Sequence, residues 1–137
     1  MSTMSDDARR ELLAGIAFFN GCTERELRDI AMLATERRLG AGQDLCHQGE
    51  FESDVFVIVD GGADVLIDGR PAGTTRVGEI VGELSMLGNG RRKATVRATT
   101  PLHVLVLDPR EVDSVLSADP SSARRLSQHG GEPGLET

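Results

Sequence analysis

The run from Val81 to Val96 holds the residues whose types and spacing most clearly imply chemistry. Gly82 opens what reads as a short helix, Glu83 lies in its first turn, and Arg92 follows near the end of the run. The first turn of a helix offers unpaired backbone N–H groups and a partial positive charge, and both favour an anion. Arginine binds phosphate through two parallel hydrogen bonds, whereas a carboxylate beside a phosphate needs a hydroxyl donor. The run therefore predicts a site for a phosphate joined to a sugar, as in a nucleotide.

Helical segments flank the part of the chain that contains this run. Residues 1–35 are predicted to be helical, with a capping box at Thr23-Glu24-Arg25-Glu26 that starts the second helix. Asp108-Pro109-Arg110-Glu111 combines an N-cap aspartate, a proline at the first helical position and an acid in the first turn. It predicts C-terminal helices of the same domain over residues 109–128. Residues 129–137 are glycine-rich and read as a flexible tail.

Residues 36–108 have the texture of short strands separated by glycine turns. Val55 to Val59 is an apolar β-rich run, Ala63 to Ile67 alternates, and Asp68-Gly69 is a hairpin signal. We expect two further strands. One contains Leu45 and His47, with both side chains on one face, and the other covers residues 74–77. Roughly eight such strands predict an α+β, mainly β domain: an eight-stranded jelly roll, or double-stranded β-helix, with helices at its ends.

Composition narrows the function classes. The net charge of −7 would repel a polyanion, so we expect no direct nucleic-acid binding by this chain. No apolar window is long enough to span a membrane, and no leader is legible, so we expect a cytoplasmic protein. Cys22 and Cys46 are interpreted as buried free thiols, and His47 as a half-buried strand residue. Neither a metal-ligand cluster nor a catalytic triad is legible, so neither an enzyme nor a metal cofactor is predicted.

Two stretches resemble signatures of one known family. Gly82-Glu83-Leu84-Ser85 followed by Arg92-Lys93-Ala94-Thr95 resembles the phosphate-binding cassette of cyclic nucleotide-binding domains. The stretch from Gly42 to Glu50, with the strand that runs on to Gly61, resembles the family's Gly-x-x-Ile/Leu-x-x-Gln-Gly-Glu … Ile-x-x-Gly signature. Both are similar to the sensor half of Crp/Fnr-type regulators, and the resemblance covers about residues 12–128.

The resemblance implies a role for each matching position. Arg92 would pair with the phosphate of a cyclic nucleotide, and Glu83 would accept a hydrogen bond from the ribose 2′-hydroxyl. The anion would also meet the backbone N–H groups of the cassette helix, and the rest of the pocket would be apolar. The implied ligand-binding residues are Gly82, Glu83, Leu84, Ser85, Arg92, Lys93 and Ala94, with Val65, Val81 and Val96 as pocket walls.

The sequence departs from the family pattern at three places. Arg91 stands where proline is usual, and Lys93 stands where a small residue is frequent. A serine or threonine at the second position favours guanine in some members, so Lys93 makes cyclic AMP the favoured ligand over cyclic GMP. The long C-terminal helix that covers the base in the family is expected to be absent or supplied by another chain.

The predicted function is a cyclic nucleotide-binding regulatory domain. Ligand capture would shift the flanking helices, chiefly Asp108 to Ala118, and pass the signal to a separate effector or within a homodimer. One alternative is a degenerate member that binds no nucleotide and serves as a protein-interaction or dimerisation module. Another is the sensor half of a Crp/Fnr-type transcription regulator that lacks its DNA-binding half.

Overall fold

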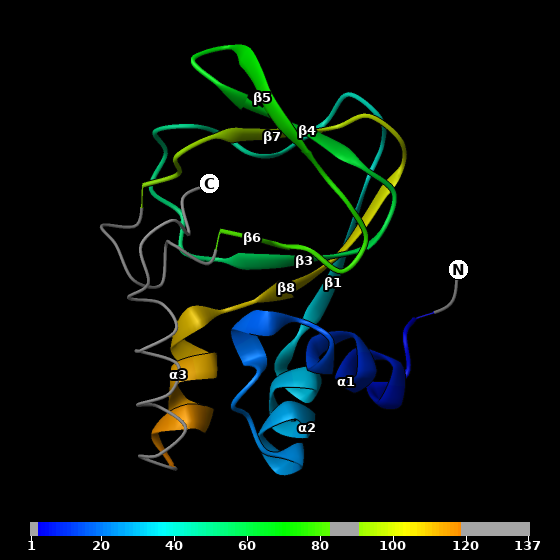
Figure 1. Ribbon diagram of the computed structural model, residues 1–137, viewed down its shortest axis with the longest axis vertical. Helices are drawn as coiled ribbons and strands as arrows, with labels where there is room; N and C mark the ends of the chain where they lie inside the picture. Colours follow the sequence, from blue (N-terminus) through cyan, green and yellow to red (C-terminus); the bar gives the residue numbers. More distant parts are fainter. Residues whose placement is uncertain (1–2, 83–90, 119–137) are drawn as a thin grey trace.

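Within residues 3–82 and 91–118, which the computed structural model describes, the chain forms two antiparallel four-stranded sheets and four helical segments (Figure 1). The helical segments are α1 (Asp6–Ala14), the 3₁₀ turn η1 (Ala17–Phe19), α2 (Glu24–Leu33) and α3 (Pro109–Ser117). The first sheet contains, in spatial order, β1 (Thr35–Leu39), β8 (Leu102–Leu107), β3 (Val55–Asp60) and β6 (Ile80–Val81). The second contains β2 (Asp44–Cys46), β7 (Thr95–Ala98), β4 (Ala63–Ile67) and β5 (Arg70–Thr75). This arrangement confirms the predicted jelly roll.

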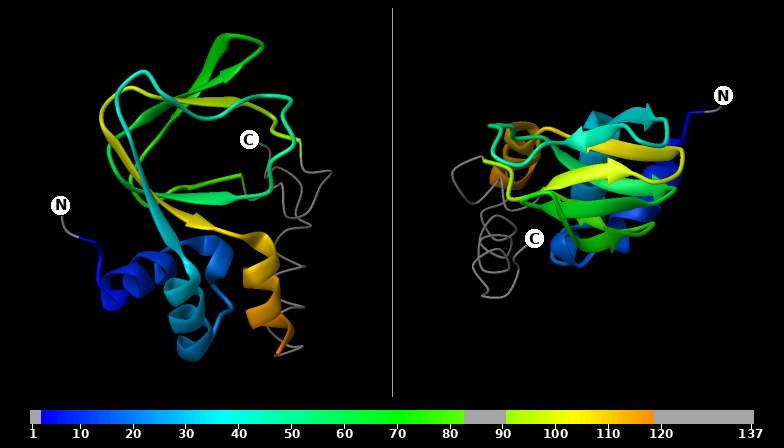
Figure 2. Two further views of the ribbon diagram at one scale, coloured as in Figure 1. Left: turned by 180° about the vertical axis from the view of Figure 1, so that it is seen from behind. Right: turned by 90° about the horizontal axis from the view of Figure 1, so that it is seen from above.

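The helices gather at one end of the roll. They lie against the sheet that contains β1, β8 and β3, and the second sheet is on the far side (Figures 1 and 2). Two packed sheets bury only the faces that they turn toward each other. An outer face that carries apolar side chains needs another layer to cover it. The helices supply that layer.

Strands β3 and β8 are buried on both faces. Val55 and Val57 pack with the helices, whereas Phe56 and Ile58 pack between the two sheets. The apolar run over β3 is therefore continuous rather than alternating, as expected for a strand covered on both sides. Strand β8 divides in the same way, with Leu105 and Leu107 on the helix side and Leu102, Val104 and Val106 between the sheets.

Side-chain caps start the helices where the sequence predicts them. The Glu26 N–H donates to Thr23 Oγ1 at 3.1 Å and the Thr23 N–H donates to Glu26 Oε1 at 2.7 Å, which confirms the capping box. Asp108 caps α3. The first helix stops before Gly15, a residue with poor helix propensity. The chain then turns back through η1.

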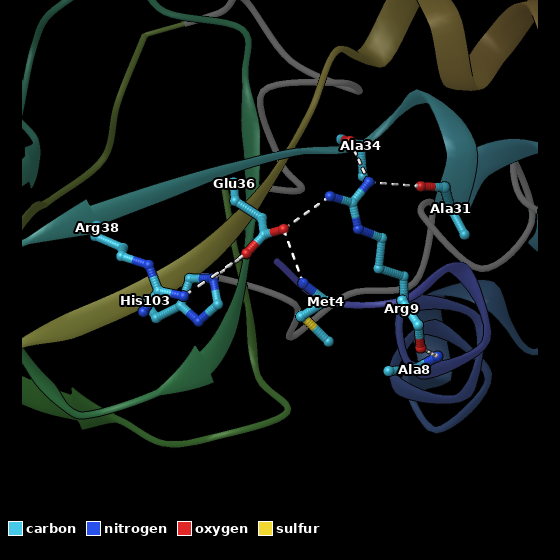
Figure 3. Close-up of polar contacts among 9 residues, drawn as sticks. Met4, Ala8, Arg9, Ala31, Ala34, Glu36, Arg38 and His103 are labelled. Atoms are coloured by element: carbon cyan, nitrogen blue, oxygen red, sulfur yellow. Dashed lines mark hydrogen bonds and ion pairs between the residues drawn. The ribbon is translucent and has the colours of Figure 1, made fainter. Parts of the chain in front are cut away.

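A buried polar cluster ties α1 to the first sheet (Figure 3). Glu36 Oε2 accepts hydrogen bonds from Arg9 Nη2 at 2.9 Å and from the Met4 N–H at 3.1 Å, and Glu36 Oε1 lies 2.7 Å from His103 Nε2. Arg9 Nη1 also donates to the Ala34 carbonyl oxygen at 2.7 Å. The hydrogen bond from Arg9 holds the pKa of the Glu36 carboxyl below its ordinary value. The cluster therefore joins α1, the end of α2, β1 and β8.

Strand β2 departs from simple alternation. The prediction placed Leu45 and His47 on one buried face, but Leu45 and Cys46 are the buried pair and His47 is exposed. The register shifts between Asp44 and Cys46, which turns the second side chain inward. The exposed imidazole lies 3.0 Å from an Asp44 carboxylate oxygen and 2.8 Å from a Glu50 carboxylate oxygen, so the half-buried interpretation of His47 is wrong.

The hairpin between β4 and β5 is confirmed, and its second strand lies earlier than predicted. Asp68 has φ 53° and Gly69 has φ 76°, as a tight hairpin turn requires. Strand β5 begins directly after this turn and ends at Thr75, whereas residues 74–77 were expected to form the strand. Val77 is 57% exposed. The helix predicted after Val81 and the helix predicted over residues 122–128 lie outside the described residues.

Candidate functional site

A pocket opens between the two sheets at the end of the roll. Its empty volume is about 660 Å³, a figure that includes the open solvent at its mouth. Strands β2, β4, β5, β6 and β7 and the segment before β7 all contribute to it. The described residues that line it are Cys46, Val65, Thr74, Thr75, Glu79, Ile80, Val81, Gly82, Arg91, Arg92, Lys93, Ala94 and Val96.

The structure brings most of the sequence-predicted site residues together. Gly82 and Arg92 lie on one wall region with Lys93 and Ala94, although the sequence between residues 82 and 91 separates them. The predicted apolar walls Val65, Val81 and Val96 line the same pocket, and Val65 and Val96 are direct neighbours across β4 and β7. Three further predicted residues, Glu83, Leu84 and Ser85, lie outside the described residues.

Arg92, of the three adjacent basic residues, is the buried one. Arg92, Ala94 and Val96 are buried, whereas Arg91 and Lys93 are exposed. Residues 93 and 94 form a bend that leads into β7. Lys93 is exposed where it borders the pocket.

The guanidinium of Arg92 is held by groups from the loop before β3. Its side chain is 3% exposed, and Nη2 donates to the Asp54 carbonyl oxygen at 2.5 Å. Glu52 Oε1 lies 3.4 Å from the same nitrogen. The guanidinium carbon lies 5.3 Å from the centre of the Phe56 ring, within range of a cation–π contact. These contacts hold the buried guanidinium at the pocket wall.

Gly82 makes room for that guanidinium. Its φ is 88°, and a Cβ atom placed on it would lie 2.1 Å from Arg92 Nη1 and 3.1 Å from the Asp54 carbonyl oxygen. Only glycine combines this backbone conformation with so close an approach. The backbone at residue 82 and the arginine side chain are therefore in direct contact at the pocket wall.

The two signature stretches of the sequence meet at this point. The Gly49 N–H donates to the Arg92 carbonyl oxygen at 2.8 Å, and the Arg92 N–H donates to the Glu50 carbonyl oxygen at 2.9 Å. Gly49 has φ 86°, a conformation that glycine tolerates. The Gln-Gly-Glu stretch thus forms the backbone support of the buried arginine.

Arg91, where proline is usual in the family pattern, is bonded to the same loop. Its Nη1 donates to the Gly49 carbonyl oxygen at 2.6 Å, and its guanidinium carbon lies 4.1 Å from the centre of the Phe51 ring. Phe51 is 69% exposed, so the guanidinium of Arg91 packs over the ring at the protein surface. The departure from proline therefore replaces a rigid residue by a side chain that clamps two segments.

Several pocket residues were not predicted from the sequence. Thr74 and Thr75 come from β5, Glu79 precedes β6 and Ile80 begins it, and no local motif marks them. Cys46 also lines the pocket, and its Sγ lies 3.7 Å from the Ala94 carbonyl oxygen. Burial raises the pKa of the Cys46 thiol, which favours its neutral form. The inward turn of β2 that places Cys46 there is not legible in the sequence.

Other site types find little support in the part of the chain that the structure describes. There, no group of three or more His, Cys, Asp and Glu side chains is placed to hold a metal ion. None of the helices described is long and apolar enough to cross a membrane.

The two cysteines differ in burial. Cys46 is a buried thiol as predicted, but Cys22 is partly exposed, so that half of the prediction is wrong.

Comparison with known proteins places this architecture in a family. The profile of the cyclic nucleotide-binding domain matches residues 36–119. The chain is 32% identical over 91 residues to the cGMP-dependent protein kinase egl-4 of Caenorhabditis briggsae, covering 66% of this chain and 12% of the kinase. It is 27% identical over 128 residues to a cyclic nucleotide-gated potassium channel of Rhizobium etli, covering 90% of this chain and 36% of the channel.

A solved structure shares the fold. The regulatory domain of Toxoplasma gondii PKA with cAMP superposes with a TM-score of 0.76 at 18% identity, covering 90% of this chain and 49% of that one. The chain spans roughly a tenth to a third of the length of the two curated relatives, so it corresponds to one domain of each. The family match covers more than half of the chain, and the jelly roll and pocket agree with it. The chain belongs to the cyclic nucleotide-binding domain family.

Proposed function

We propose that this chain is a regulatory sensor domain whose pocket binds a cyclic nucleoside monophosphate, with cyclic AMP favoured. The observation that carries the proposal is the buried guanidinium of Arg92, fixed at the wall of a largely apolar pocket against Gly82. A buried, pre-positioned arginine in such a pocket is suited to a phosphate attached to an apolar or aromatic group. A nucleotide has that composition.

Each part of the ligand has a proposed partner. The phosphate would accept hydrogen bonds from Arg92, and the cassette that begins at Gly82, with Glu83, Leu84 and Ser85, would provide backbone N–H groups. Glu83 would accept from the ribose 2′-hydroxyl. The sugar and base would pack against Val65, Val81 and Val96, which line the pocket.

Two considerations favour cyclic AMP over cyclic GMP. The residue after Arg92 is Lys93, which is exposed at the pocket border and lacks the small hydroxyl that some family members place there. The similar regulatory domain from Toxoplasma gondii was solved with cAMP. The kinase relative is named for cGMP, which is why both nucleotides belong in the test.

We propose that ligand binding acts on the helices through β3. Phe56 contacts the Arg92 guanidinium on the pocket side, and its neighbours Val55 and Val57 pack with the helices on the other side. A change in the position of the arginine would bias the packing of α3, and a partner domain, a separate effector or a second copy would read the result.

Isothermal titration calorimetry with cyclic AMP and cyclic GMP tests the proposal. The wild-type chain should bind cyclic AMP more tightly than cyclic GMP. Arg92→Ala should weaken binding by about a hundredfold, since it removes a charged partner from a desolvated site. Arg70→Ala, which removes the same charge from the exposed β5 strand, should leave the affinity within about twofold. Absence of heat with both nucleotides at millimolar concentration, in a chain shown to be folded, would refute the proposal and favour the degenerate interaction module.

A further inference from the structure

Glu52 places a negative charge directly behind the proposed phosphate site. Its Oε1 lies 3.4 Å from Arg92 Nη2, and its side chain is 30% exposed, so it is partly screened by solvent. Glu52 does not line the pocket, whereas Arg92 does. The carboxylate therefore acts on a pocket ligand through the arginine and through space.

The arginine has structural supports other than this carboxylate. Nη2 also donates to the Asp54 carbonyl oxygen at 2.5 Å, and Nη1 is seated against Gly82. The backbone of Arg92 is bonded on both sides, to Gly49 and to Glu50. The Asp54 carbonyl oxygen and Gly82 are neutral groups at the guanidinium, and the other two bonds hold the main chain of Arg92. What Glu52 adds to them is mainly a charge.

That charge has opposite consequences for the empty and the filled site. In the empty site it neutralises a buried cation, which is favourable. In the filled site it repels the phosphate, and the repulsion is proportional to the charge that the phosphate carries. A cyclic phosphodiester carries one negative charge, whereas a phosphomonoester carries nearly two at pH 7 because its second pKa is about 6.

We infer that Glu52 sets the charge the phosphate site accepts, so that the site selects a singly charged cyclic phosphodiester against a doubly charged nucleoside monophosphate. The inference rests on the proposed function, because it concerns the same pocket and names what the pocket rejects. A linear nucleotide has the same base and sugar as its cyclic counterpart. Apolar packing against the base cannot separate them, and the charge behind Arg92 can.

The test compares Glu52→Gln with wild type for two probes, cyclic AMP and 5′-AMP, by competition calorimetry. Glutamine keeps the shape of the side chain and an oxygen acceptor for Arg92, and removes the charge. The affinity for cyclic AMP should rise about three- to tenfold, given a partly screened unit charge a few ångströms behind the phosphate. The affinity for 5′-AMP should rise by roughly the square of that factor, so the preference for the cyclic nucleotide falls three- to tenfold.

Glu11→Gln is the matched control. It removes the same charge from a position on α1 whose side chain is 75% exposed and which does not line the pocket. It should change neither affinity by more than about twofold. Thermal melting confirms that both variants fold.

The outcomes separate the two claims. If wild type binds cyclic AMP and Glu52→Gln leaves the ratio of the two affinities unchanged, or binds both probes more weakly, Glu52 is a structural anchor and the inference is overturned. If neither wild type nor Glu52→Gln binds cyclic AMP, the proposed function fails, and the inference fails with it. A ratio that falls in Glu52→Gln and not in Glu11→Gln supports both.

Discussion

Replacing Gly82 by alanine should lower the free energy of unfolding in two ways. The first is the backbone, since φ is 88° at Gly82. An L-residue in a left-handed conformation costs about 1–2 kcal/mol, offset by about 0.4–1 kcal/mol because alanine restricts the unfolded chain. The second cost is steric, because the new Cβ would lie 2.1 Å from Arg92 Nη1 and the guanidinium would have to move.

The steric cost can be worked out from what the guanidinium would lose. Arg92 is 3% exposed, so its guanidinium has little room to shift, and the move breaks its hydrogen bond to the Asp54 carbonyl oxygen. A hydrogen bond to a charged group contributes about 1.5–3 kcal/mol. Gly82→Ala should therefore lower the free energy of unfolding by about 3 kcal/mol in all, which leaves a domain of ordinary stability folded.

Gly78→Ala is the control that isolates the contact. Gly78 has the same φ of 88°, but a Cβ placed on it meets nothing within 4 Å. It should lose only the backbone part, about 1 kcal/mol. Urea unfolding at pH 7, followed by circular dichroism, measures both values. Equal losses in the two variants, within about 0.5 kcal/mol, would show that Gly82 is retained for its backbone alone and that Arg92 is not seated against it.

Three further predictions concern the Glu36 cluster, the cap of α2 and the two cysteines. Glu36→Gln should lower stability at pH 7 by about 1–3 kcal/mol. Because Arg9 depresses the pKa of Glu36, this stabilisation is present above the ordinary carboxyl pKa and lost as pH falls through the depressed value, so the wild-type advantage in urea should disappear at acid pH. Thr23→Ala should remove half of the capping box and cost about 1 kcal/mol in the same assay, whereas Thr23→Ser should cost less. Cys46, buried and with a raised pKa, should react with a thiol reagent far more slowly than the partly exposed Cys22, and mass spectrometry of the labelled chain that found the reverse order would contradict the burial.

Local rules carried the sequence prediction a long way in this chain. The capping box, the aspartate-proline helix start and the Asp68-Gly69 hairpin depend on neighbouring residues alone, and all three are confirmed. Arg92 was singled out by its spacing after Gly82, and it is the buried base of its triplet. Each of these features is fixed by chemistry within a few residues, so a single sequence contains it.

The remaining features depend on contacts between distant segments. Asp54 bonds to Arg92 through a backbone carbonyl, which carries no side-chain signature. Thr75 lines the pocket because β5 begins directly after its hairpin turn. The pattern of apolar residues did not predict that start. Cys46 was predicted to be buried, but its position in the pocket wall results from a register shift opposite β7 that alternation did not predict. The pocket residues Thr74, Glu79 and Ile80 were missed for the same reason.

Strand β3 lies between the interior of the β-roll and the helical layer. Its side chains form the lining of the roll on one face and the floor under the helices on the other. Between Phe56, which contacts the arginine of the pocket, and Val57, which contacts the helical layer, there is only one peptide unit. A signal from the pocket would therefore have to cross only the thickness of one strand to reach the helical layer.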